Sequence, residues 1–112
     1  MYEICSMSAL IVSATEMEVA PFRTEFPEAS CLITGVGIPM AIFQLTKKLQ
    51  EQNYEVIFQV GIAGTYTNDL PLGGAVVVAK DCFADVGLYQ GNTFHTIFDM
   101  GFASPDDFPF TN

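Results

Sequence analysis

Basic side chains are scarce in this sequence. Four lysines and arginines stand against thirteen aspartates and glutamates, which gives a formal net charge of −9, and the largest basic cluster is the pair Lys47 and Lys48. Proteins that bind nucleic acid or an anionic membrane surface need lysine and arginine to displace counterions or to meet lipid charge, so neither partner is expected. The same shortage argues against a phosphate-rich ligand, although amides at a helix amino terminus bind phosphate without basic side chains.

Long apolar runs and closely spaced metal ligands are also missing. No apolar stretch approaches the ~20 residues of a membrane-spanning helix, and the amino terminus lacks the positive region of a signal peptide. Cys5, Cys31 and Cys82 are odd in number and widely spaced, which is typical of reduced thiols rather than of a disulfide framework or a metal site. His95 has no cysteine or carboxylate at ligand spacing. We therefore expect a cytoplasmic protein with no metal and no cofactor.

The apolar residues that are present suffice for one folded core. Half of the 112 residues are hydrophobic, which excludes intrinsic disorder and predicts a single domain over residues 1–112. Short continuous apolar runs predict buried strands, and each of the first two is followed by a segment suited to a helix. The predicted strands lie at 8–14, 31–33 and 56–60, and the predicted helices at 15–26 and 38–52. This order of elements indicates an α/β fold.

The remainder of the chain departs from a plain alternation of strand and helix. A turn at Gly73 and Gly74 precedes an apolar run from Ala75 to about Ala79, which predicts a fourth strand. No helix of ordinary length fits before it, so we expect this strand to be antiparallel or joined by an irregular loop, which makes the predicted sheet mixed. From about residue 91 no helical or strand period persists, and we expect an irregular apolar tail that packs on another surface.

Each of the first three predicted strands ends in a polar or glycine-rich turn. The first is followed by residues 15–18, the second by Gly35-Val36-Gly37, and the third by residues 61–64, Gly-Ile-Ala-Gly. If the strands are parallel neighbours, these turns lie along one edge of the sheet, where open α/β sheets bind their ligands. Each turn taken singly is also explained by the need for glycine in tight turns after strands.

Two carboxylates, Glu16 and Glu18, follow the first strand. Thr15 with Glu18 three residues later has the spacing of a capping box, and acidic residues are favoured near a helix amino terminus by its dipole. Only one of the two carboxylates can point inward from a helix. A mechanism with paired carboxylates is therefore disfavoured, and Glu16 is expected on the surface.

The segments "IVSATEMEV", "TGVG", "YEVIFQVGIAGTY" and "LGGAVVVAKDCFADVG" occur in this order. Together they resemble the first half of the nucleoside phosphorylase and nucleosidase superfamily, most closely the futalosine hydrolases, which are relatives of the methylthioadenosine/adenosylhomocysteine nucleosidases. The resemblance covers about residues 8–90. It implies a central mixed sheet flanked by helices, and cleavage of a purine N-glycosidic bond in the context of menaquinone biosynthesis.

The resemblance also implies roles for particular residues. Glu18 matches the carboxylate that orients and activates the attacking water in these nucleosidases. Thr15 lies in the same loop, and the loop of Gly61, Ile62, Ala63 and Gly64 matches the one that passes close to ribose and base. Phe83 is expected to face the ligand or a neighbouring subunit.

Departures from the phosphorylase pattern favour water as the nucleophile. Phosphorylases of the superfamily carry an arginine and a serine at the positions held here by Gln59 and Ile62, and their first loop also carries an arginine. A site with a carboxylate and no arginine repels phosphate. By letters the Glu-Met-Glu at 16–18 also resembles a ribose-binding segment of the family's second half, but its place directly after the first strand assigns it to the water site.

The ribose-binding segment and the aspartate that protonates the departing purine have no matching positions in this sequence. We therefore expect a chain that carries the amino-terminal half of the fold and is weakly active or inactive. The alternative is a non-catalytic α/β module that binds a nucleoside or assembles with itself. An incomplete sheet leaves an unpaired edge and apolar surface, which predicts a homo-oligomer formed through that edge and the apolar tail.

Overall fold

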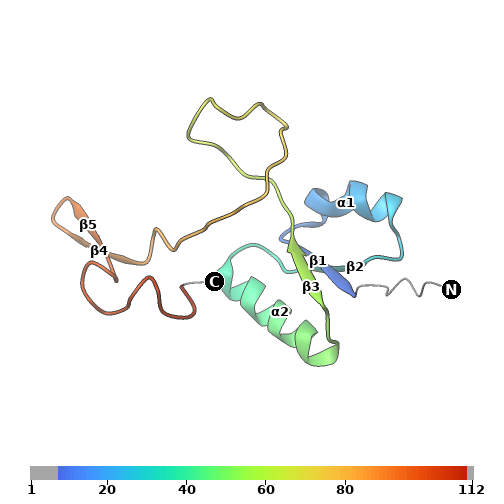
Figure 1. Ribbon diagram of the computed structural model, residues 1–112, viewed down its shortest axis with the longest axis horizontal. Helices are drawn as coiled ribbons and strands as arrows, with labels where there is room; N and C mark the ends of the chain where they lie inside the picture. Colours follow the sequence, from blue (N-terminus) through green and yellow to red (C-terminus); the bar gives the residue numbers. More distant parts are fainter. Residues whose placement is uncertain (1–7, 111–112) are drawn as a thin grey trace. The chain divides into compact units, whose positions relative to one another are not determined.

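A computed structural model of the chain describes residues 8–110 (Figure 1). The chain divides into two compact units, one that ends at Asn68 and one that begins at Asp69. The first unit contains β1 (Ala9–Ser13), α1 (Glu16–Glu25), β2 (Ser30–Ile33), α2 (Ile38–Glu51) and β3 (Val56–Gln59). The second contains β4 (Gly87–Gln90) and β5 (Thr93–Thr96). Each unit has its own sheet, whereas the sequence predicted one domain.

The sheet of the first unit has three parallel strands in the order β2-β1-β3. The central strand β1 is the most buried, with Leu10 fully buried and Val12 nearly so. Leu10 and Val12 share one face of the strand, and Ala9 and Ile11 on the other face are half-buried. The apolar run at Ala9–Val12 suits this central position. Parallel pairing of all three predicted strands confirms the expectation that their carboxyl ends lie at one edge.

The two successive connections of this parallel sheet run to opposite sides of β1. The chain passes from β1 to β2 on one side, and then crosses back past β1 to β3 on the other. Connections between parallel strands are almost always right-handed. Because the two connections run in opposite directions across the sheet, their helices belong on opposite faces. Figure 1 shows α1 and α2 on opposite sides of the strands. The point of reversal lies between β1 and β3, and crevices at such points hold the ligands of open α/β sheets.

Helix α1 covers the sheet at β1. Its Val19 is 1% exposed and forms the core with the buried residues of β1. Pro21 lies inside the helix, which continues past it to Glu25. The capping box predicted from Thr15 and Glu18 is present, which confirms where the helix begins.

Helix α2 begins after Gly37, whose positive φ of 99° suits glycine. Pro39 lies in its first turn, where proline is favoured because its missing N–H has no helical partner there. None of its residues is buried. Ile42 and Phe43 are each 62% exposed, so the described residues of the first unit leave the apolar face of α2 uncovered.

The second unit is built on an antiparallel hairpin of β4 and β5. Gly91 has a positive φ of 62° at the first of the two turn positions, which is the arrangement of a type II′ turn. The rings of Phe83 and Phe98 both pack edge-on against Phe110, with centroids 5.4 and 5.1 Å from it. These ring contacts supply a small apolar cluster for the unit.

Two expectations about this region were wrong. The predicted fourth strand at Ala75–Ala79 is not formed, and Val77 in its middle is 96% exposed. The segment beyond residue 91, expected to be irregular, opens with strand β5. The α/β class is confirmed. Parallel and antiparallel pairing both occur, but in two separate sheets.

Candidate functional site

The candidate site lies where the three parallel strands end. The N–H of Thr34, just after β2, donates to the carbonyl of Ser13 at 2.9 Å, and the N–H of Val60, just after β3, donates to the carbonyl of Val12 at 2.8 Å. These bonds continue the sheet ladder to the last residues of β1. The turns after β1, β2 and β3 are therefore held side by side at one edge.

Glu18 lies on the first turn of α1 and points back toward the turn that precedes the helix. Its Oε2 accepts hydrogen bonds from the Thr15 hydroxyl at 2.7 Å and from the Thr15 N–H at 2.9 Å. The Ser13 hydroxyl lies 3.4 Å from the same oxygen and 3.2 Å from the Thr15 carbonyl, which it also donates to. Ser13 is 1% exposed, so the carboxylate is supported from within the core.

The other carboxylate oxygen faces the loop after β3. Oε1 of Glu18 accepts a hydrogen bond from the Ile62 N–H at 3.1 Å. A Cβ placed on the neighbouring Gly61 would lie 3.0 Å from Oε1. Glycine at this position therefore allows the backbone to approach the carboxylate closely. Glu18 joins the turns after β1 and β3 across the point where the strand order reverses.

Hydrogen bonding lowers the pKa of Glu18 below its usual value of 4.5. The Thr15 hydroxyl is the largest cause, followed by the Ile62 N–H; partial burial opposes them, and the Thr15 N–H and the Ser13 hydroxyl add to the lowering. Hydrogen bonds to the charged form of a carboxyl stabilise that form. Glu18 is therefore ionised at neutral pH, and all of these donors are neutral groups. Such a carboxylate orients water through its oxygens and disfavours anions beside it.

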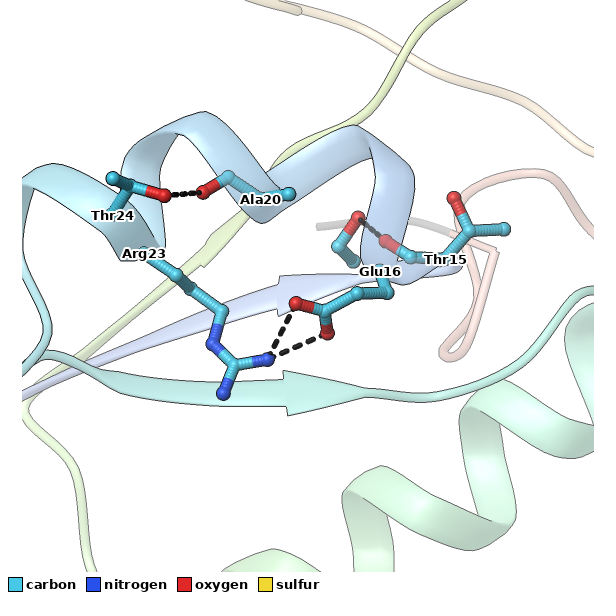
Figure 2. A network of polar contacts seen from close by, with 6 residues as sticks. Thr15, Glu16, Ala20, Arg23 and Thr24 are labelled. Carbon is cyan, nitrogen blue, oxygen red and sulfur yellow. Dashed lines mark hydrogen bonds and ion pairs between the residues drawn. The ribbon is translucent and has the colours of Figure 1, made fainter.

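Glu16 does not belong to this arrangement. Both of its carboxylate oxygens contact Nη1 of Arg23, at 2.6 and 2.7 Å, in an exposed ion pair on α1 (Figure 2). Exposed pairs of this kind contribute about 0–1 kcal/mol to stability. The expectation that only one of the two carboxylates points inward is confirmed, with Glu18 as that residue and Glu16 on the surface.

Ala63, Gly64 and Phe83 are the remaining predicted site residues. Ala63 and Gly64 follow Ile62 in the exposed loop after β3, and a Cβ on Gly64 would meet no atom within 4 Å. Phe83 belongs to the second unit, where its ring contacts Phe110. The structure thus brings together Thr15, Glu18, Gly61 and Ile62.

Ser13 and Thr34 are site residues that sequence reasoning missed. Both are buried polar side chains at strand ends, and the Thr34 hydroxyl lies 2.9 Å from the Gly35 carbonyl and 3.4 Å from the Ser13 carbonyl, donating to both. A hydroxyl at the end of an apolar run, directly before a polar turn, was the available signal for each. Asp99, which was not assigned a role, accepts hydrogen bonds from the Thr96 hydroxyl and N–H, and these lower its pKa.

Within residues 8–110, His, Cys, Asp and Glu side chains form no group of three or more able to hold a metal ion. Cys31 and Cys82 are free thiols, and Cys5 lies outside the described residues. In the same part of the chain, no helix has the length and apolar character required to cross a membrane.

The chain matches no family model, no curated protein and no solved structure.

Proposed function

We propose that this protein is a purine nucleosidase of the futalosine hydrolase type, built on the amino-terminal part of a nucleoside-phosphorylase-like fold. The observation that carries the proposal is the ionised carboxylate of Glu18, held by neutral donors at the point where the strand order reverses. The substrate is a purine nucleoside, and the setting is cytoplasmic menaquinone biosynthesis, as the resemblance implies.

The chemistry of such a carboxylate fits hydrolysis. As the bond from C1′ to the purine nitrogen breaks, its electron pair leaves with the base, and the ribose becomes an oxocarbenium-like cation. The oxygen of a water molecule forms the new bond to C1′, and Glu18 accepts the proton that this water loses. The negative charge of Glu18 also favours the cationic transition state and disfavours phosphate as a competing nucleophile.

Protonation of the departing purine is the step for which the Glu18 site supplies no acid. The departing purine must gain a proton, yet residues 1–68 contain no aspartate. Protonation of the base therefore falls to solvent or to an acid outside the Glu18 site. Losing an interaction made only in the transition state lowers kcat, so we expect slow turnover from this chain.

Release of hypoxanthine from futalosine, followed by chromatography over long incubations, tests the proposal. Wild-type protein should release base, and Glu18→Gln should lower the rate by roughly 10²–10⁴-fold, the usual worth of a positioned general base. Glu16→Gln is the matched control because Glu16 is an exposed carboxylate two residues before Glu18 on the same helical turn. This variant should retain wild-type activity. Equal rates for the two variants would overturn the proposal.

A second candidate function, self-assembly without catalysis, is favoured by a separate observation. Within residues 8–110, β3 pairs only with β1, and Phe58 is 48% exposed. The first unit also leaves the apolar face of α2 uncovered. Uncovered apolar faces and free strand edges promote association with another chain. If the protein neither releases base nor binds nucleoside in a titration, and sedimentation shows oligomers, assembly is the function that remains.

A further inference from the structure

The two oxygens of the Glu18 carboxylate have different surroundings. A carboxylate oxygen offers about two lone-pair sites. Oε2 already has two close donors, the hydroxyl and the N–H of Thr15, with the Ser13 hydroxyl as a third at longer range. Among residues 8–110, Oε1 has one donor, the N–H of Ile62. Acceptor capacity therefore remains on Oε1 and is exhausted on Oε2.

We propose that Thr15 is a positioning residue for hydrolysis: by occupying Oε2 of Glu18 it assigns Oε1 as the oxygen that meets the attacking water. This inference rests on the proposed nucleosidase function. Thr15 does not contact the reacting atoms in this proposal. It acts through Glu18, by setting the rotation of the carboxylate and by leaving one oxygen available.

The surroundings of Oε1 agree with this assignment. Ile62 N–H fixes the oxygen on the side of the loop after β3, which is the loop expected to approach the nucleoside. Gly61 presents no side chain there, and even a Cβ at this position would crowd Oε1 at 3.0 Å. A water molecule bound to the free lone pair of Oε1 then lies at the reversal point of the sheet, where ligands of such folds bind.

The proton balance of the step follows from this arrangement. The water oxygen forms its bond to C1′, one water proton passes to Oε1, and the electron pair of the broken bond leaves with the purine. The protonated Glu18 then returns its proton to solvent. The donors that hold Oε2 make Glu18 a weak base, which suits a reaction in which the sugar cation forms ahead of proton transfer.

Thr15→Val tests the inference, because valine matches threonine in shape but lacks the hydroxyl. Thr15→Ser is the control that keeps the hydroxyl. Removing the strongest donor to Oε2 should raise the pKa of Glu18, and the acid limb of the kcat/KM profile should move to higher pH with it. Misplacement of the carboxylate should lower kcat on the plateau by roughly 10–100-fold. Thr15→Ser should keep the acid limb and kcat close to their wild-type values.

Two nuclear magnetic resonance signals give a readout that does not require turnover. The Glu18 carboxyl carbon reports its own titration, and the Ile62 amide proton reports the bond to Oε1. In Thr15→Val the pH midpoints of the two titrating signals should rise together. Ser13→Ala removes the more distant donor and should raise both midpoints less.

The outcomes separate the inference from the function on which it rests. Unchanged midpoints in Thr15→Val, or an acid limb that stays in place while the plateau falls, would show that Thr15 has only a structural role and would overturn the inference. If wild-type protein releases no base at all, the proposed function fails and the positioning role fails with it, even where the midpoints shift as expected.

Discussion

The carboxylate of Glu18 accepts a hydrogen bond from the Ile62 N–H at 3.1 Å, across 44 positions of sequence. This bond ties the start of α1 to the loop that follows β3. Thr15 and Ser13 support the carboxylate from the other side, so one ionised group organises two of the three turns at the edge of the sheet. The position of Glu18 relative to the loop is therefore the feature on which the local structure and the proposed catalysis both depend.

Gly61→Ala should displace Glu18. The new Cβ would lie 3.0 Å from Oε1, a distance at which the carboxylate or the loop must move. We expect weakening of the bond to Ile62, seen as an upfield shift of its amide proton, and a roughly 10-fold or larger loss of base release because small displacements at a reacting group are costly.

Gly64→Ala is the matched control for this change. It lies in the same loop, and its Cβ would meet no atom within 4 Å, so the Ile62 signal and the activity should stay at wild-type values. Similar effects from both substitutions would indicate general loop sensitivity rather than contact with Glu18.

The stability of the first unit should depend on pH through Glu18. The pKa of Glu18 is lower in the folded protein than the usual 4.5, so the folded state favours the ionised form. This stabilisation is fully present above about pH 4.5, the unfolded-state value, and is lost as the pH falls through the folded-state pKa. We expect the difference in urea midpoint between wild type and Glu18→Gln, followed by helical circular dichroism, to shrink as the pH is lowered from 6 toward about 3.

Glu16→Gln provides the comparison for this pH dependence. Its exposed ion pair with Arg23 contributes little to stability, and its difference from wild type should stay small across the same range. A Glu18→Gln difference that is constant with pH would contradict the contribution assigned to Glu18.

Leu10→Ala should destabilise the first unit strongly. Leu10 is fully buried on the central strand, and removal of a buried leucine side chain costs about 2–5 kcal/mol in free energy of unfolding. Met17→Ala, at a position 74% exposed, should change it by less than about 0.5 kcal/mol. Urea denaturation of both variants checks this, and equal midpoints would contradict the placement of Leu10 in the core.

Association through α2 should respond to charge and to salt. Ile42 and Phe43 are exposed on its apolar face, while the net charge of −9 opposes self-association. Added salt screens that repulsion, so sedimentation should show more oligomer at high ionic strength in wild type. Phe43→Glu should abolish this increase, and Lys48→Gln, which lowers the net charge by the same one unit on the same helix, serves as a control for charge alone. Equal loss in both variants would point to net charge and not to the apolar face.

The elements of the first unit were largely predictable from local sequence. Continuous apolar runs identified β1, β2 and β3, and the spacing of Thr15 and Glu18 marked the start of α1, because each of these signals acts between residues close in the chain. The run at Ala75–Ala79 was read as a strand on the same grounds, but a strand needs a partner as well as a β-branched sequence. The β4–β5 hairpin was missed although Gly91-Asn92 is a recognised turn signal between two short runs.

By itself the sequence determined that the protein has an α/β fold, that Glu18 lies on the first turn of a helix after a buried strand, and that a glycine loop follows the third strand. These properties depend on apolar periodicity and on capping, which are local. Only the tertiary structure decided that Ile62 donates to Oε1 and that the loop closes against Glu18. Those contacts depend on strand order and parallel register, which bring together residues whose proximity no local pattern encodes.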